Sequence, residues 1–223
     1  MKLKKTTINN NPYLGVNSFV TEEFCLVPSN ILKKEEKVLK EYFKETKIIK
    51  TSINQSPLLG VFSIGLKDKI VVGTDDSILK EIDILEKEKI KVKVINDYNA
   101  LGNLICLNSN YGFAADFLKD QTIKEISSFL KVDIEKKNIA GIDLIGSSLY
   151  VNDHLFLVNP NISEIDYKYI SKKLKVKGIP ITLNYGGSFV GNDAIGNREV
   201  LFIGNKTSNA ELLRIDDLIV DIK

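Results

Sequence analysis

The residues of this chain best suited to covalent chemistry are two cysteines, Cys25 and Cys106, and a single histidine, His154. A cysteine acts as a nucleophile when it is a thiolate with a base within reach. Each cysteine lies inside a short apolar run (FCL and ICL), whereas His154 follows the turn-prone pair Asn152-Asp153. This placement predicts two buried, inert thiols and a surface histidine, with no Cys–His pair.

Other patterns that carry chemistry are missing from the sequence. The spacing of the two cysteines fits neither a metal-ligand motif nor a disulfide framework. No glycine-rich phosphate loop is present. We therefore expect no catalytic residue, no metal site and no cofactor.

A repeat in the sequence indicates which elements position these residues. An apolar residue followed by glycine recurs five times, with the glycines 45, 42, 44 and 45 residues apart: Leu14-Gly15, Leu59-Gly60, Leu101-Gly102, Ile145-Gly146 and Val190-Gly191. A small or apolar residue follows each glycine by twelve positions: Val27, Val72, Ala114, Val158 and Ile203. A period in this range is typical of repeat architectures. The function must then belong to the array that the units build.

The second unit shows the expected order of elements most clearly. Residues 58–64 and 70–72 are β-prone and flank a turn at 67–69, which predicts a hairpin. Thr74, Asp75 and Asp76 offer an N-cap and first-turn carboxylates to a helix with Ile78, Ile82 and Leu85 on one face. Residues 90–94 alternate as a half-buried strand. Each unit therefore reads as strand, turn, strand, helix and strand.

The other units repeat this order of elements, with turn and helix-capping residues at equivalent positions. Ser29 or Asn30 is the expected helix cap in the first unit, and Ser163 is the expected cap in the fourth, before Ile165, Tyr169 and Ile170 on the buried side. Ser208 and Glu211 form a capping box in the fifth unit. The glycines imply either a positive φ or a close approach of two backbones, which would bring five strands together near an axis.

The chain ends complete this α/β arrangement. The fifth unit stops soon after its helix, and residues 2–8 alternate as the strand that it lacks. A ring closed by its own N-terminal strand has no open sheet edge between units. We expect a single domain over 1–223, with units at about 9–50, 51–95, 96–139, 140–181 and 182–223, and 1–8 closing the fifth.

Composition limits the classes of function. Hydrophobic residues make up 43% and charged residues 27%, as in ordinary soluble proteins. A net charge of +2, with Arg198 and Arg214 as the only arginines, argues against a nucleic-acid reader. The sequence shows no signal peptide and no stretch long enough to span a membrane. We expect a cytoplasmic protein with no membrane partner.

Several short motifs occur in order along the chain. The most specific is Asn99-Ala100-Leu101-Gly102-Asn103, supported by the first hairpin from Val16 to Pro28, by Gly146-Ser147 and by Thr207 with Glu211-Leu212. In these motifs the chain resembles the translation initiation factor 6 family in its archaeal form. The similarity covers essentially the whole chain. The fifth unit departs most, with polar residues at Val190-Gly191-Asn192-Asp193.

The resemblance implies a pentein fold, with five ββαβ-type units around a pseudo-fivefold axis. It also implies binding to the intersubunit face of the large (50S) ribosomal subunit, which sterically prevents association with the small subunit, in initiation and in subunit biogenesis. The implied partner is an L14-type ribosomal protein near the sarcin–ricin loop of the large rRNA. We expect a monomer and no enzyme.

The expected partner-binding residues follow the repeated glycines, because equivalent positions in a pseudo-symmetric ring share one rim. They are Val16, Val61, Asn103 and Ser147, with the flanking Asn99. Alternatively, Asn103 satisfies a neighbouring unit's backbone at the axis. Lys67 and Lys69 are candidates for contact with rRNA phosphate.

Two other classes of function stay open at this point. Some penteins are guanidino-group-modifying enzymes that use a cysteine, a histidine and carboxylates. A ring that threads nucleic acid is a further alternative, although five units of this size leave little room for a duplex.

Overall fold

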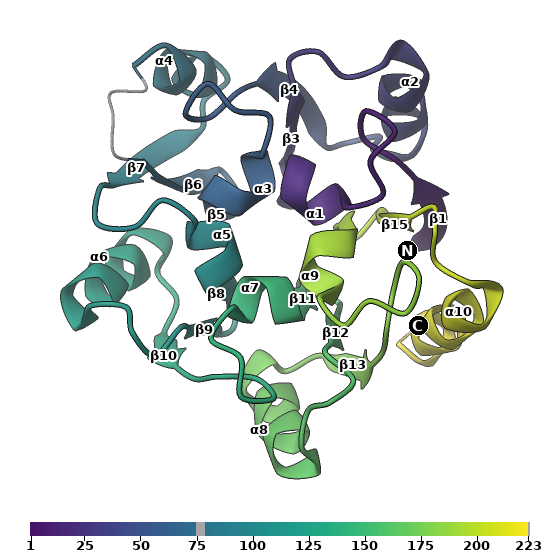
Figure 1. Cartoon of the computed structure of the whole chain (residues 1–223). Coiled ribbons are helices and arrows are strands. Elements are labelled where there is room, and N and C mark those ends of the chain that lie inside the picture. Colours follow the sequence, from purple (N-terminus) through teal and green to yellow (C-terminus); the bar gives the residue numbers. More distant parts are fainter. Residues whose placement is uncertain (75–78, 223) are drawn as a thin grey trace.

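The computed structural model describes residues 1–74 and 79–222. Within these ranges the chain forms five three-stranded sheets, one for each unit. Figure 1 shows the units arranged around a central axis, with short helices innermost and longer helices at the periphery. The expected pentein architecture, α/β with five repeated units, is therefore confirmed.

Each unit begins with a helix of four residues that contains the repeated glycine. These short helices are α1 (Leu14–Asn17), α3 (Leu59–Phe62), α5 (Leu101–Leu104), α7 (Ile145–Ser148) and α9 (Val190–Asp193). The prediction of one continuous strand over 58–64 was wrong, because residues 59–62 form α3 and only 63–66 form a strand. A single helical turn is too short to be stable by itself, so tertiary packing must hold it.

A β-hairpin follows each short helix. Its first strands are β2 (Phe19–Val20), β5 (Ser63–Leu66), β8 (Ile105–Leu107), β11 (Leu149–Val151) and β14 (Ala194–Gly196). Its second strands are β3 (Phe24–Pro28), β6 (Lys69–Gly73), β9 (Gly112–Ala114), β12 (Leu155–Val158) and β15 (Val200–Gly204). The second strands are the buried, central members of the sheets.

A peripheral helix and a third, parallel strand complete each unit. The helices are α2 (Lys33–Tyr42), α4 (Leu79–Lys87), α6 (Asp120–Leu130), α8 (Glu164–Leu174) and α10 (Asn209–Asp221). The third strands of the first four units are β4 (Lys47–Thr51), β7 (Lys91–Ile95), β10 (Ile134–Lys136) and β13 (Lys177–Pro180). The fifth unit takes its third strand, β1 (Lys2–Thr6), from the N-terminus.

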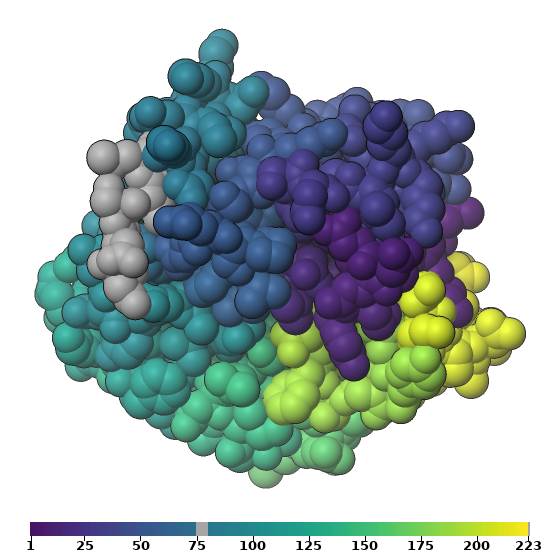
Figure 2. Space-filling model, turned by 45° about the horizontal axis from the view of Figure 1, so that its top comes forward, coloured from purple at the N-terminus to yellow at the C-terminus, as the bar shows by residue number. Residues whose placement is uncertain are grey.

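The pairing of β1 joins the two ends of the chain. β1 lies parallel to β15, from Lys2 opposite Val200 to Thr6 opposite Gly204. The prediction that the N-terminus supplies the strand missing from the fifth unit is confirmed for residues 2–6. Figure 2 shows the N-terminal segment, in purple, beside the C-terminal unit, in yellow.

The hydrophobic core crosses the boundaries between units. Leu39 and Phe43 of the first unit pack with Val200 and Phe202 of the fifth in one buried cluster. The buried Ile64, Val71 and Ile95 of the second unit join a cluster whose other buried residues belong to the third. A unit alone would leave these faces exposed, so we propose that residues 1–223 fold as one domain.

The predicted helix caps have mixed outcomes. Ser163 caps α8 through the N–H of Asp166, and Ser208 with Glu211 forms the capping box of α10, both as expected. The expected cap at Ser29 or Asn30 was wrong, since α2 begins at Lys33 with Leu32 at its N-cap and no side-chain cap. Asp75, Asp76 and Ile78 lie outside the described residues.

Two residues predicted on the buried side of α8 lie at the surface. Ile165 is 82% exposed, and Tyr169 is exposed as well. Ile170 is buried as expected, together with Leu174. The apolar residues of α8 therefore occupy more than one side of the helix, and sequence spacing alone did not decide between them.

Candidate functional site

The repeated glycines meet one another at the centre of the molecule. A Cβ atom added to Gly60 would lie 1.8 Å from the carbonyl oxygen of Gly15, and one added to Gly102 would lie 1.7 Å from that of Gly60. The same relation continues through Gly146 and Gly191, and from Gly191 back to Gly15. Close backbone approach, rather than positive φ, therefore explains the five recurring glycines, which we call the glycine ladder. No duplex of nucleic acid could pass through such a packed centre.

The short helices and the segments that lead into them form one face of the molecule (Figure 1). We call this surface the short-helix face; it comprises residues 9–17, 53–62, 96–104, 139–148 and 183–193. These segments contain no lysine, arginine or histidine, although the chain has 31 lysines and arginines. Their acidic residues are Asp97, Asp143 and Asp193, of which Asp193 is buried.

Large apolar side chains are exposed at equivalent positions of this face. The residue before each apolar-Gly pair is Tyr13, Leu58, Ala100, Leu144 or Phe189. The four large members of this set are between 36% and 47% exposed. Tyr185, in the loop before α9, is also exposed. A surface with few charged residues and with aromatic and aliphatic groups at its centre is typical of protein–protein interfaces.

The predicted partner-binding residues occupy the third position of the short helices. Val16, Val61 and Asn103 are half-buried on this face, whereas Ser147 is only 3% exposed and offers little to a partner. Asn99 lies just before α5, and its carbonyl oxygen accepts a hydrogen bond from the N–H of Leu101. Whether any of them contacts a partner stays a prediction.

The environment of Asn103 distinguishes the two interpretations of this residue. Asn103 belongs to helix α5, not to the strand entry that the sequence suggested. Within the described part of the chain its side-chain amide makes no hydrogen bond, so it does not satisfy a neighbouring unit's backbone. An unused amide can bond a partner instead.

Sequence reasoning missed the exposed apolar positions just before the glycine pairs. Tyr13, Leu58, Leu144 and Phe189 share the register of the ladder, so the repeat itself was the signal that could have found them. The residues after the glycines were chosen instead.

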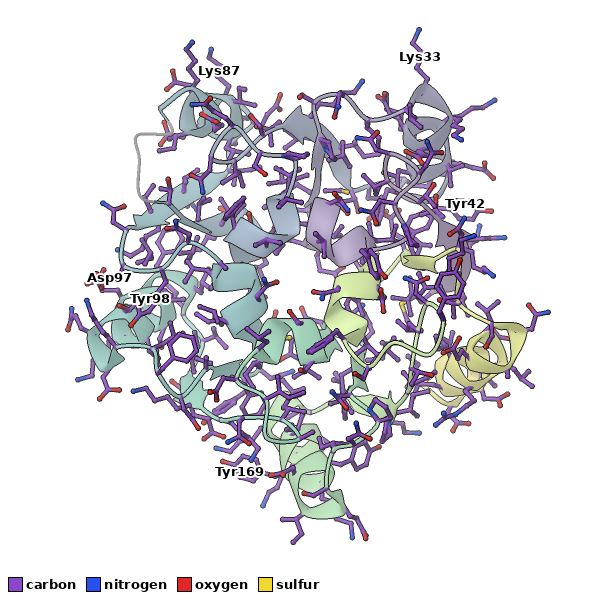
Figure 3. All side chains as sticks on the ribbon, in the orientation of Figure 1. Lys33, Tyr42, Lys87, Asp97, Tyr98 and Tyr169 are labelled. Carbon is purple, nitrogen blue, oxygen red and sulfur yellow. The ribbon has the colours of Figure 1, made fainter. Side chains whose placement is uncertain are left out.

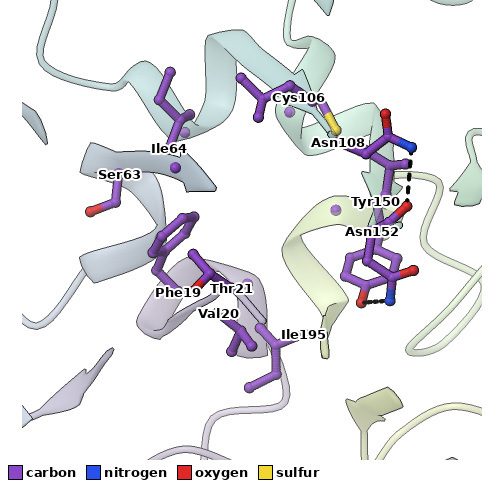
Figure 4. A pocket seen from close by; sticks show the side chains of 18 of the residues that line it. Phe19, Val20, Thr21, Ser63, Ile64, Cys106, Asn108, Tyr150, Asn152 and Ile195 are labelled. Carbon is purple, nitrogen blue, oxygen red and sulfur yellow. Dashed lines mark hydrogen bonds between the residues drawn. The ribbon is translucent and has the colours of Figure 1, made fainter. Parts of the chain in front are cut away.

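A partly open cavity of about 140 Å³ lies on the axis and is lined by the hairpins on the other side of the short helices. The first strands contribute equivalent residues to its wall: Phe19, Ile64, Cys106, Tyr150 and Ile195 (Figure 4). The placement of Cys106 at this cavity was not foreseen from the sequence. Its Sγ donates to the carbonyl oxygen of Leu149 at 3.0 Å.

The electrostatics of the thiols disfavour nucleophilic chemistry. Burial raises the pKa of Cys106 to about 12 and raises that of Cys25 further still. A thiol in this state is protonated at neutral pH and is a poor nucleophile. The Nε2 of His154 lies 3.6 Å from Glu22 at the hairpin turns, where it has a carboxylate partner.

The two lysines considered for contact with rRNA phosphate differ in their surroundings. Lys69 donates to the carbonyl oxygen of Phe129 at 2.5 Å, whereas Lys67 is exposed.

Among the described residues no group of three or more His, Cys, Asp or Glu side chains could hold a metal ion. No helix in the described ranges has the length and apolar character needed to cross a membrane.

Known proteins of similar sequence are archaeal translation factors. The chain is 32% identical to "Translation initiation factor 6" of Nanoarchaeum equitans over 223 residues, covering 98% of this chain and 100% of that protein. The factor of the same name from Picrophilus torridus is 31% identical over 217 residues, covering 96% and 98%. The one from Pyrococcus abyssi is 30% identical over 224 residues, covering 97% and 98%.

Solved structures of similar fold are pentein enzymes. The substrate-bound N-terminal domain of ArgZ, an arginine dihydrolase from the ornithine–ammonia cycle in cyanobacteria, aligns with a TM-score of 0.54 at 13% identity, covering 83% of this chain and 74% of that one. Apo ArgZ gives a TM-score of 0.54 at 12% identity, and this chain spans 32% of its length. At these identities the likeness concerns the fold alone.

The family follows from the sequence comparisons. A model of the eIF-6 family matches residues 3–218, which is nearly the whole chain. Relatives at 30% identity or more cover it from end to end. The five-unit fold and the glycine ladder agree with this assignment. This chain therefore belongs to the eIF-6 family.

Proposed function

We propose that the chain binds the large ribosomal subunit through its short-helix face and thereby prevents association with the small subunit. Membership of the eIF-6 family supports a role in translation initiation. The observation that carries the finer proposal is the surface itself, with exposed Tyr13, Leu58, Leu144 and Phe189 and no basic residue in its segments. Such a factor acts as a monomer in the cytoplasm during translation initiation. It binds free large subunits, including those present during subunit biogenesis.

The chemistry of this face favours a protein partner over RNA. Lysine and arginine neutralise phosphate charge, and the segments of the short-helix face have neither. Lysines from outside these segments reach only its periphery, as where Lys119 pairs with Asp97. Aromatic rings, aliphatic side chains and the free amide of Asn103 suit a protein surface. An L14-type ribosomal protein near the sarcin–ricin loop, the partner implied by the family resemblance, fits this requirement.

The mechanism is steric and involves no bond making. The short helices are locked by backbone contacts between glycines, so the face is rigid before binding. A rigid surface loses little conformational entropy on docking. Once bound, the protein occupies the surface of the large subunit that the small subunit needs for association.

We infer that catalysis is not part of this function. The guanidino-modifying alternative needs a thiolate, but burial holds the Cys106 thiol in its protonated form. Hydrolysis of arginine or agmatine that depended on Cys106 would contradict this inference.

Sedimentation tests the proposal directly. Purified protein is mixed with large subunits from the same organism and centrifuged through sucrose, then small subunits are added to the complex. We expect co-sedimentation at a ratio near one to one and loss of joined ribosomes. Failure to co-sediment, or binding that leaves joining intact, would refute it.

A further inference from the structure

The charge of the chain is unevenly distributed along its sequence. Residues 1–51 contain ten lysines and six glutamates, a net charge of +4, whereas the whole chain carries +2. The small total therefore conceals a basic segment. This segment comprises β1, the first hairpin, α2 and β4, and its outer elements lie at one edge of the molecule (Figure 1).

Two lysines of β1 share one aromatic ring. Lys2 and Lys4 alternate along the strand and so point to the same side of it. Their Nζ atoms lie 5.4 and 5.1 Å from the centroid of the Tyr42 ring. The ring itself packs edge-on against Phe202 at 5.8 Å, which fixes its position.

These two ammonium groups lack a carboxylate partner. Neither Lys2 nor Lys4 forms an ion pair with any residue in the described ranges, and both are exposed. Like charges held at one ring repel each other at close range. An anion placed between them would relieve that repulsion, which makes this pair suited to a phosphate group.

Helix α2 adds a row of lysines to the same edge. Lys33, Lys37 and Lys40 are exposed and recur at spacings of four and three, on the side of the helix opposite the buried Leu39. At 1.5 Å per residue these steps are about 6 and 4.5 Å. Figure 3 shows Lys33 projecting outward from α2 and Tyr42 beside β1.

The glutamates of α2 are largely neutralised or engaged. Glu35 is buried and accepts hydrogen bonds from Thr7 and from the N–H groups of Asn9 and Asn10. Glu36 pairs with both Lys40 and Lys50. Only Glu41 remains exposed along this helix among its acidic residues in the described structure.

The pseudo-symmetry of the fold provides an internal comparison. Helix α10 occupies the place in the fifth unit that α2 occupies in the first, yet it carries four acidic residues and one arginine. Asp216, Asp217 and Asp221 are exposed along it. The lysine row of α2 is therefore a property of this helix and not a consequence of the fold.

We propose that this lysine edge, comprising Lys2, Lys4, Lys33, Lys37, Lys40 and Tyr42, binds the phosphate backbone of RNA. Lysine acts as a point charge on phosphate, without the bidentate geometry of arginine, so the contact carries no base readout. The surface is distinct from the short-helix face. This inference goes beyond the proposed function, because it requires no ribosomal subunit.

Fluorescence anisotropy with a labelled uridine RNA of about 20 nucleotides tests the proposal, over a series of salt concentrations. The variant is Lys2→Glu/Lys4→Glu. The matched control is Lys124→Glu/Lys172→Glu, which makes the same charge change at exposed lysines of α6 and α8. Lys2→Gln/Lys4→Gln serves as a milder second variant, and thermal melts verify folding.

We expect the wild-type protein to bind at low salt and the β1 variant to bind about tenfold more weakly. The slope of log K against log salt should fall by about 1.4, which corresponds to two lost phosphate contacts on a single strand. The control should change affinity less than about twofold. Equal losses in both variants, absence of RNA binding, or tighter binding to anionic lipid vesicles than to RNA would overturn the proposal. Because no subunit is present, these outcomes are independent of the subunit-joining assay.

Discussion

The short-helix face and the hairpin turns use their polar groups in different ways. Thr21 at the first turn donates to the carbonyl oxygen of Lys67 at the second, and Ser109 at the third bonds Asp153 at the fourth. Asn197 at the fifth turn donates to Thr21 of the first. On the short-helix face, by contrast, the amide of Asn103 has no partner among the described residues. Polar groups at the turns connect neighbouring units. On the short-helix face some polar groups also bond within the protein, such as Asn184 with Pro12, but the Asn103 amide is left for a ligand.

The largest effect on stability should follow from disrupting the central backbone contacts between glycines, which support both the short-helix face and the hairpins. In Gly102→Val a side chain would meet the backbone of Gly60, where even a Cβ atom would lie 1.7 Å from an oxygen. We expect a loss of more than about 4 kcal/mol of unfolding free energy, since backbone must move. Urea denaturation measures it.

Gly141→Ala is the control for that experiment. Gly141 has a φ of +73° but nothing within 4 Å of its added Cβ. A cost of about 1–2 kcal/mol from backbone conformation alone is expected. Equal losses at the two glycines would contradict the role assigned to the central contacts.

A buried carboxylate in the short-helix segments predicts a pH effect on stability. Burial raises the pKa of Asp193 to about 6, although a hydrogen bond from Asn184 at 2.8 Å opposes the shift. A folded pKa above the unfolded value favours folding below about pH 4, and this contribution is lost as pH rises through 6. Asp193→Asn should therefore gain on the order of 2 kcal/mol relative to wild type between pH 4 and 7.5. Urea melts across this range measure the difference, and a constant difference would contradict the assignment.

At the hairpin turns, Glu199 predicts the opposite dependence on pH. Burial acts to raise its pKa, but hydrogen bonds from the Thr46 side chain and from the N–H groups of Lys44, Glu45 and Thr46 outweigh it and lower the pKa. Its contribution is thus present above the unfolded pKa of about 4.5 and lost as pH falls through the folded value.

Glu199→Gln should cost about 1–2 kcal/mol at pH 7, because charged hydrogen bonds between the fifth and first units are weakened. Thermal melts at pH 7 and at about pH 3 measure the cost in both states of the carboxylate. A penalty that does not shrink in acid would show that the ionised carboxylate is not what joins these units.

The smallest effect on stability is expected on the short-helix face itself. Asn103→Ser should change the unfolding free energy by less than about 0.5 kcal/mol, because the amide that it removes has no partner. Differential scanning calorimetry measures this change. A large loss of stability would instead support an axial structural role for Asn103.

The sequence predicted the repeated features and missed those that depend on packing. The glycine ladder, the hairpins, the Ser208–Glu211 capping box and the N-terminal strand each have a local signal, and the structure confirms them. Helix α3 was missed because four residues are too few for a helical period, and its stability comes from neighbouring glycines.

The candidate site was only partly predictable for the same reason. The repeat register located the segments that form the short helices but not which of their positions is exposed. Ser147 is buried while Leu58 and Phe189, one residue before the ladder, are open to solvent. The basic edge was hidden because net charge averages over units that differ in sign.

The most direct test of the docking face compares two identical substitutions. Leu58→Glu places a charge on the short-helix face, and Leu213→Glu places the same charge at a more exposed leucine of α10. Binding to large subunits is measured by sedimentation for both, with thermal melts as a folding control. We predict that Leu58→Glu weakens binding at least tenfold and restores subunit joining, whereas Leu213→Glu behaves as wild type. Unchanged binding by a folded Leu58→Glu protein would contradict the assignment of this face.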